Sequence, residues 1–150
     1  MKKSFSKTLS ANDVGATGAH QAGMLVPKGE KELLEFLPRL DSAIKNPDAW
    51  IRCIDEDGRE RKFRFVYYNN KRHDPAGTRD EYRLTYMTSY LREMRAREND
   101  ILEISRADKS GNYAVRIVRA VSSIRPSAAL PPAVTDNVRI KITSGWRQNH

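Results

Sequence analysis

The sequence predicts a mostly β, barrel-like domain that also carries two short helices. Short runs that alternate apolar and polar side chains recur along the chain, as expected of strands with one buried face. Glycine, proline, asparagine and aspartate gather between these runs, where tight turns need them. Helical spacing of apolar residues is confined to two short segments. Many short strands with few helices are typical of a barrel or a sandwich.

The first part of the chain predicts a strand, a polar loop and a helix. Residues 3–9 alternate weakly and predict a strand, and a polar, glycine-containing loop follows at 10–23. Residues 24–27 are short and apolar. Over residues 30–40, leucines recur at helical spacing behind glutamates that suit a helix N-terminus. We expect Pro38 to end or kink this helix, because proline lacks the backbone N–H that a helix interior uses.

The middle of the chain predicts a β-hairpin followed by an exposed arm. Residues 49–55 and 60–69 are rich in aromatic and β-branched residues, and Asp57-Gly58 between them is a hairpin turn signal. Residues 70–80 combine basic side chains with proline and glycine. That composition suits an exposed arm better than a core element.

The remaining elements are three strands and a second helix. Residues 81–88 predict a strand, after which Ser89 is expected to cap a short amphipathic helix. Residues 101–106 and 113–121 flank a turn and predict two further strands.

The length and charge of the chain indicate one domain with a polyanionic partner. A chain of 150 residues, 39% of them hydrophobic, can bury a core without a metal or a disulfide. The net charge is +8 at pH 7, from 27 Lys and Arg against 19 Asp and Glu, which favours nucleic acid as the partner. We expect the domain at residues 1–124. Residues 125–150 are expected to be a proline- and alanine-rich linker or extension, in which 138–143 is either a last strand or the start of a neighbouring domain.

The sequence also predicts where the protein works. No stretch approaches the roughly 20 apolar residues of a spanning helix, and the N-terminus does not continue into the apolar segment of a signal peptide. The single cysteine, Cys53, cannot form an internal disulfide and is expected to be a buried strand residue. We expect a monomeric domain in a reducing, cytoplasmic setting, with no membrane partner.

The loop at residues 10–23 reads SANDVGATGAHQAG and is built to touch a partner. Its glycines allow close backbone approach, and its polar side chains would be left unsatisfied in a core. The run closely resembles S-A-N-D-x-G-A-T-G-x-H-Q-x-G in the N-terminal effector-binding domain of EcoRII-type (type IIE) restriction endonucleases. Residues 67–70, YYNN, and 78–85, TRDEYRLT, are similar to that family as well. The resemblance implies an open seven-stranded β pseudobarrel, like that of plant B-three transcription factors, in which two arms grip the major groove of double-stranded DNA.

The resemblance also implies which residues contact DNA. The base-reading residues would be Asn12, Asp13, Thr17, His20 and Gln21 in one arm and Arg79, Glu81 and Arg83 in the other. The DNA backbone would be contacted by Lys7, Ser10, Lys71, Arg72, His73 and Thr78. These residue types suit the task, because arginine pairs with guanine, glutamate accepts from cytosine, and asparagine or glutamine pairs with adenine. By analogy with the family, the site would be 5′-CCWGG or a close relative.

The sequence departs from the family pattern in the second arm. Gly77 stands where the family has a lysine before Thr-Arg, Tyr82 replaces another lysine, and residues 73–76 lengthen the arm. In the family, this domain binds a copy of the recognition sequence and so regulates a separate catalytic domain. The resemblance therefore implies a prokaryotic protein and no catalytic residue in this chain. The domain would be either part of a parent protein with a covalently linked nuclease domain or encoded alone.

An alternative class is a Mg²⁺-dependent nuclease. Asp48, Glu60 and Lys62 spell a loose PD…ExK pattern, in which two carboxylates hold Mg²⁺ and a lysine helps to activate water. In a chain this rich in charge, such spacings arise easily by chance. The three histidines lack cysteine partners for zinc, and GATGAH lacks the lysine of a phosphate-binding loop. We therefore expect neither a cofactor nor a metal.

Overall fold

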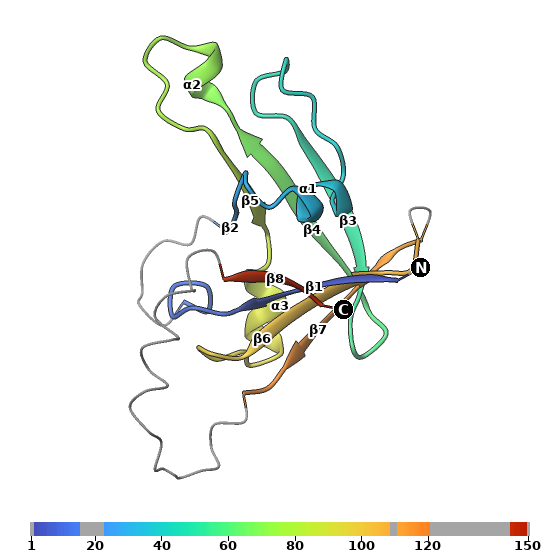
Figure 1. The fold of residues 1–150 in the computed structure, drawn as a ribbon. Coiled ribbons are helices and arrows are strands. Elements are labelled where there is room, and N and C mark those ends of the chain that lie inside the picture. Colours follow the sequence, from blue (N-terminus) through green and yellow to red (C-terminus); the bar gives the residue numbers. More distant parts are fainter. Residues whose placement is uncertain (1, 16–22, 109–110, 121–144, 150) are drawn as a thin grey trace, which may run out of the picture.

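The computed structural model describes residues 2–15, 23–108, 111–120 and 145–149. Within these residues, eight strands form one sheet in the order β2-β5-β4-β3-β7-β6-β1-β8 (Figure 1). The strands are β1 (Lys3–Thr8), β2 (Met24–Val26), β3 (Asp48–Ile54), β4 (Glu60–Tyr68), β5 (Glu81–Thr85), β6 (Ile101–Arg106), β7 (Tyr113–Val118) and β8 (Trp146–Asn149). The helices are α1 (Lys31–Phe36), α2 (Asn70–His73) and α3 (Thr88–Glu93). The predicted mostly β fold is confirmed.

The sheet curls into a nearly closed barrel made of two halves. Strands β2, β5, β4 and β3 form one antiparallel half, and β7, β6, β1 and β8 form the other. The halves join through a short parallel pairing of Cys53 with Tyr113 and of Ile54 with Ala114. At the far ends of the sheet, the indole N–H of Trp146 donates to the carbonyl of Leu25 over 2.9 Å. This contact links the two edge strands of the sheet.

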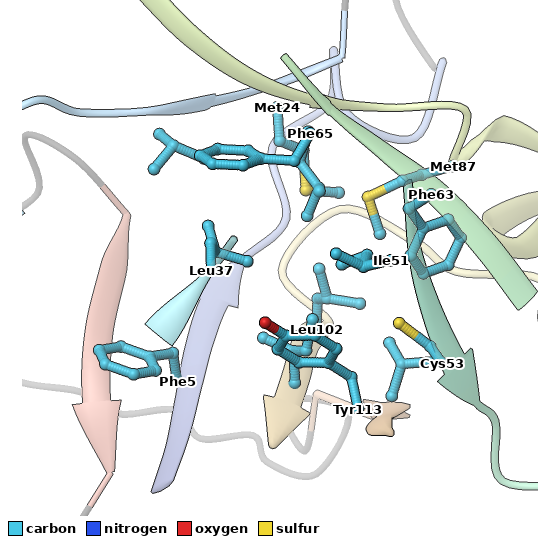
Figure 2. Packing of buried hydrophobic residues seen from close by; sticks show 14 of the residues in the cluster. Phe5, Met24, Leu37, Ile51, Cys53, Phe63, Phe65, Met87, Leu102 and Tyr113 are labelled. Atoms are coloured by element: carbon cyan, nitrogen blue, oxygen red, sulfur yellow. The ribbon is translucent and has the colours of Figure 1, made fainter. Parts of the chain in front are cut away.

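The core fills the space between the two halves. Figure 2 shows side chains from both halves, including Phe5, Phe65 and Tyr113, packed together in the interior. Helix α1 seals this space, because its Phe36 ring lies 4.9 Å from the ring of Phe5 and 5.2 Å from that of Tyr113. The Tyr113 hydroxyl donates to the Phe36 carbonyl over 2.7 Å, so its polar end is satisfied where it is buried.

Side chains alternate between buried and exposed along the strands, which is why the strands could be predicted. In β3, Ile51 and Cys53 are buried while their neighbours Trp50, Arg52 and Ile54 face outward. The expected burial of Cys53 is confirmed, and burial raises the pKa of its thiol to about 12. None of the helices in the described part of the chain is long or apolar enough to cross a membrane.

The helices differ from the sequence predictions at their ends. Helix α1 stops at Phe36, and Leu37 is extended because it precedes Pro38. Strand β5 ends at Thr85, where Tyr86 turns the chain with a φ of 65°. Helix α3 consequently begins at Thr88, and the prediction that Ser89 caps it was wrong, since Ser89 lies inside the helix.

Two further elements were absent from the sequence predictions. The arm at 70–80 opens with a single helical turn, α2, in which the N–H of Asp74 donates to the carbonyl of Asn70. Strand β8 pairs with β1 in the region expected to be an extension. Its sequence is polar apart from Trp146, so it carries no alternation that would reveal it. The candidate strand at 138–143 lies outside the described residues.

Candidate nucleic-acid interface

Two connections between strands correspond to the predicted arms. The first arm is residues 10–23, between β1 and β2, and the second arm is residues 69–80, between β4 and β5. In Figure 1 the second arm, with α2 at its tip, extends well beyond the sheet. Of the predicted base-reading residues, Thr17, His20 and Gln21 lie outside the described residues. The remaining five can be placed.

The roots of the two arms are fastened to one another. Strand β2, which follows the first arm, pairs with β5, which follows the second arm, so that Leu25 lies opposite Arg83. The guanidinium of Arg83 donates to the carbonyl of Gly23 over 3.0 Å. Gly23 has a φ of 94°, and a Cβ there would lie 2.6 Å from the side chain of Thr85. Glycine is therefore required for the first arm to return against β5.

The described part of the first arm is a turn held by reciprocal hydrogen bonds. The N–H of Ser10 donates to the Asp13 carboxylate over 2.9 Å, and the N–H of Asp13 donates to the Ser10 hydroxyl over 3.1 Å. Lys7 reaches the same carboxylate at 2.5 Å, and both charged side chains are largely buried. Lys7 and Asp13 therefore fix the base of the arm, while Asn12 is exposed on the turn.

The second arm is braced from within. The side chain of Asn70 accepts from the N–H of Arg79 over 2.8 Å, and the N–H of Lys71 donates to the carbonyl of Arg79 over 3.0 Å. Gly77 packs so closely on this turn that a Cβ would overlap the Asn70 carbonyl. Hydrogen bonds thus join the two sides of the arm at the backbone of Arg79.

A buried amide anchors the second arm to the neighbouring loop. Asn69 is completely buried, and its side chain accepts from the N–H of Asn46 over 2.7 Å while donating to the carbonyls of Ser42 and Ile44. The Asn46 side chain accepts from the N–H of Asn69 in return. Sequence reasoning did not single out Asn69 as a structural residue, although it belongs to the YYNN run.

Asp80 holds the other side of the arm. It pairs with Lys28 at 2.7 Å, lies 3.5 Å from Arg72 and accepts from the Tyr67 hydroxyl. Hydrogen bonds from Lys28 and Tyr67 lower the pKa of Asp80 to about 2. Burial, followed by the bond to Asp80, raises the pKa of Tyr67 to about 12. The carboxylate stays ionised, and Tyr67 stays protonated, at neutral pH.

Acid is expected to loosen this contact. The pKa of Asp80 is about 2 in the folded protein and about 3.9 in an unfolded chain. A lowered pKa stabilises the fold above the unfolded value, and this contribution is lost as pH falls from about 4 towards 2. Urea unfolding of the wild type should therefore show a steeper loss of stability across that window than unfolding of Asp80→Asn. Identical pH profiles for the two proteins would contradict this role of Asp80.

The end of the second arm and strand β5 together present two arginines bound to one carboxylate. Glu81 accepts from Arg83 at 2.6 Å and from Arg79 at 3.2 Å. Burial acts to raise the pKa of Glu81, but these arginines outweigh it and hold the pKa below its usual value. The Arg79 guanidinium also lies 3.8 Å from the centre of the Tyr68 ring. Arg79 is thus oriented from two sides while its side chain remains 38% exposed.

Both arms border one hollow of about 510 Å³. The first arm contributes Asn12, Asp13 and Gly23, and the second contributes Arg79, which lies beside Tyr68. The residues that follow β5, from Tyr86 to Ser89, complete the wall. The hollow therefore brings asparagine and arginine side chains from different arms to a common surface, where their hydrogen-bonding groups can face one ligand.

The predicted backbone-contacting residues are distributed over the same arms. Lys71, Arg72 and His73 are exposed on α2, and Thr78 is exposed beside Arg79. The His73 ring lies 3.1 Å from the carbonyl of Ser42, and Ser10 is exposed at the first arm. Lys7, by contrast, is buried against Asp13.

The residues of the PD…ExK pattern do not come together. Asp48 lies opposite Val66 at one end of the β3–β4 hairpin, and Glu60 lies at the other end. Six residues of strand separate these positions, which is about 20 Å. Asp48 pairs with Arg64 and Glu60 pairs with Arg52. Among the described residues, no group of three or more His, Cys, Asp or Glu is arranged to hold a metal.

The sequence of the chain is similar to known proteins. Residues 2–100 match the model of the family described as "Restriction endonuclease EcoRII, N-terminal". Over 84 residues, 54% of the chain, the sequence is 36% identical to the type II restriction enzyme EcoRII of Escherichia coli. The chain spans only 20% of the length of that relative.

A solved structure shows the same fold at low sequence identity. The structure titled "Arabidopsis FUS3-DNA complex" superimposes with a TM-score of 0.57 at 23% identity, covering 77% of this chain and 95% of that one. The sequence and the structure thus point to the same pseudobarrel.

Proposed function

Because the chain belongs to the EcoRII N-terminal family, we propose that it binds double-stranded DNA at a specific sequence through its two arms. The observation that carries this proposal is the shared hollow, where residues of both arms meet. The net charge of +8 favours a polyanionic ligand, and the similar plant protein was solved as a complex with DNA.

Arg79 is the residue best suited to read a base. Its side chain is partly exposed, and Tyr68 and Glu81 hold it in place. A guanidinium held in this way can donate two hydrogen bonds to O6 and N7 of guanine. Asn12, which also lines the hollow, would contribute an amide that suits adenine.

The other residues predicted to read bases have different roles in this proposal. Glu81 and Arg83 are bound to each other, so they reach bases only if DNA replaces part of that pairing. Asp13 is paired with Lys7 and acts by positioning the first arm. Thr17, His20 and Gln21 remain predicted readers. The combination suits a C- and G-rich site such as 5′-CCWGG.

The DNA backbone would be held mainly by α2. Lys71, Arg72, His73 and Thr78 are exposed on the second arm, and Ser10 is exposed on the first. Such contacts position a protein on DNA without reading sequence, and each neutralised phosphate releases counterion. Affinity should therefore fall steeply as salt concentration rises.

We place this domain in a regulatory role within a larger protein. The curated relative is a restriction enzyme of which this chain spans about a fifth. We propose that binding of a recognition sequence here controls a covalently linked nuclease domain, and that this chain has no catalytic activity alone. The separation of Asp48 from Glu60 supports that division. A cytoplasmic, monomeric domain is part of the same proposal.

Selection of bound duplexes from a random pool, in EDTA, tests the proposed function. The expected result is enrichment of one short C- and G-rich sequence. Recovery of duplexes without any shared sequence would contradict specific binding. The second part of the test is incubation of the selected duplex with Mg²⁺. Cleavage that Glu60→Gln abolishes would establish the nuclease alternative instead.

Gly77→Ala is expected to weaken DNA binding without unfolding the domain. The added Cβ would overlap the Asn70 carbonyl, so the turn that orients Arg79 must shift. The loss should approach the roughly 1–3 kcal/mol that one good base contact provides. Titration of the selected duplex measures it. Gly29→Ala is the matched control, since a Cβ there meets no atom within 4 Å, and equal affinities for the two variants would refute the role of Gly77.

A further inference from the structure

Two large aromatic side chains stand in solvent outside the arms. Trp50, on β3, is 50% exposed, and Tyr86, just after β5, is 66% exposed. Their rings contact each other edge to face, with centroids 4.8 Å apart at 67°. Aromatic residues usually bury more of their surface than this, so a paired and exposed couple indicates a contact surface.

The backbone of Tyr86 is unusual for an aromatic residue. Its φ of 65° lies in the left-handed region, which a bulky side chain enters only at a cost in energy. Asparagine or glycine would make the same turn more easily. The turn by itself therefore does not explain the presence of a tyrosine.

The aromatic pair lies on the same face of the sheet as Glu81 and Arg83. Trp50 is opposite Arg64, and Arg64 is opposite Thr85 on β5. Because side chains alternate along a strand, Thr85, Arg83 and Glu81 share that outer face. This outer face therefore extends continuously from Glu81 and Arg83 to the aromatic pair.

The hollow between the arms reaches this face. Thr85 and Tyr86 line it together with Asn12 and Arg79. The aromatic pair is thereby continuous with the surface that the arms are proposed to use. An exposed basic side chain accompanies the pair, since Lys62 lies on the same face of the sheet, opposite Arg52, while Arg52 itself is paired with Glu60. Rings that pack against deoxyribose and cations that meet phosphates suit the edge of a duplex.

We propose that Trp50 and Tyr86 form an additional DNA contact, which lies against the sugar–phosphate backbone flanking the sequence read by the arms. This inference rests on the proposed DNA binding and extends its footprint. The contact adds affinity without sequence preference, because it touches no base edge. It also requires a duplex long enough to reach beyond the recognition site.

Tryptophan fluorescence tests the contact directly. The chain has two tryptophans, and Trp146 is only 6% exposed, so Trp50 dominates quenching by acrylamide. Saturation with the selected sequence in a long duplex should lower the quenching constant at least about twofold, whereas a duplex trimmed to the recognition site should leave it near the free value. Trp50→Phe is the control and should show no DNA-dependent change.

Substitution of the second ring gives an independent readout. Tyr86→Asn removes the ring but suits the left-handed backbone, so the fold should be retained. Affinity for the long duplex should drop about fivefold more than affinity for the trimmed duplex, because Tyr86 also lines the hollow, and the order of preference among sequences should not change. An equal loss on both duplexes would overturn the proposal, because it would place Tyr86 within the recognition site.

The outcomes separate this inference from the proposed function. Absence of sequence-selective binding by the wild type would refute the proposed function, and this contact with it. Selective binding with Trp50 still fully quenchable would refute the contact alone. Protection of Trp50 by a linked nuclease domain, and not by DNA, would overturn it in favour of a protein-docking face.

Discussion

Arg79→Ala is expected to weaken binding to the preferred duplex by about 1–3 kcal/mol and to relax base preference at one position. The guanidinium lies at the hollow shared by both arms, and its contacts with Tyr68 and Glu81 fix its direction before DNA arrives. Little ordering cost therefore opposes its contact with a base. Titrations of the selected duplex and of single-base variants measure both effects.

Lys71→Ala is the matched control for this prediction. Lys71 is exposed on α2 in the same arm, and a phosphate contact should weaken all DNA alike and reduce the dependence of affinity on salt. Sequence preference should be unchanged. If Arg79→Ala lowered affinity equally for preferred and random duplexes, Arg79 would be a backbone contact and its assignment as a reader would fail.

Asp55→Ala is expected to reduce the free energy of unfolding by about 3 kcal/mol. The Asp55 side chain is fully buried and accepts from the N–H groups of Asp57 and Arg59 and from Arg61 at 2.8 Å. Breaking a buried pair costs about 3–5 kcal/mol because it strands a charge. The lower end applies here, since Arg61 keeps its bond to Glu93 at 2.8 Å.

Chemical unfolding of Asp55→Ala and of Asp57→Ala checks this expectation. Asp57 is exposed in the same turn, so its removal should change stability by no more than about 0.5 kcal/mol. Asp55 lies at the end of the β3–β4 hairpin away from the second arm. DNA affinity of the folded variant should therefore equal that of the wild type, and similar stabilities for both variants would contradict the role of Asp55.

Most of the strands were predictable because apolar and polar side chains alternate along them. Alternation in β3 and β4, with a turn signal between them, predicted the central hairpin. Strand β8 left no such record, because it is a polar edge strand that is held by pairing with β1 and by one buried indole. The end of β5 also differed, since the sequence did not show that Tyr86 would adopt a left-handed backbone.

The candidate site was likewise predictable only in part. The motifs of the two arms identified the family, and the family match confirms that identification. The motifs did not reveal that Lys7 and Asp13 would form an ion pair with each other, or that Arg83 would bind the carbonyl of Gly23. These partners lie in different elements or across a turn. Only the positions of the folded backbones bring them within hydrogen-bonding distance.

The sequence by itself determined the strand-rich fold class, the two arms and the basic charge that favours a nucleic acid. Those properties follow from composition and from patterns that repeat every two residues. The tertiary structure alone decided which charged side chains are neutralised, that both arms border one hollow, and that Trp50 meets Tyr86 in solvent. The physical reason is that pairing between side chains depends on distance in space, which residues far apart in the chain acquire only when the sheet curls.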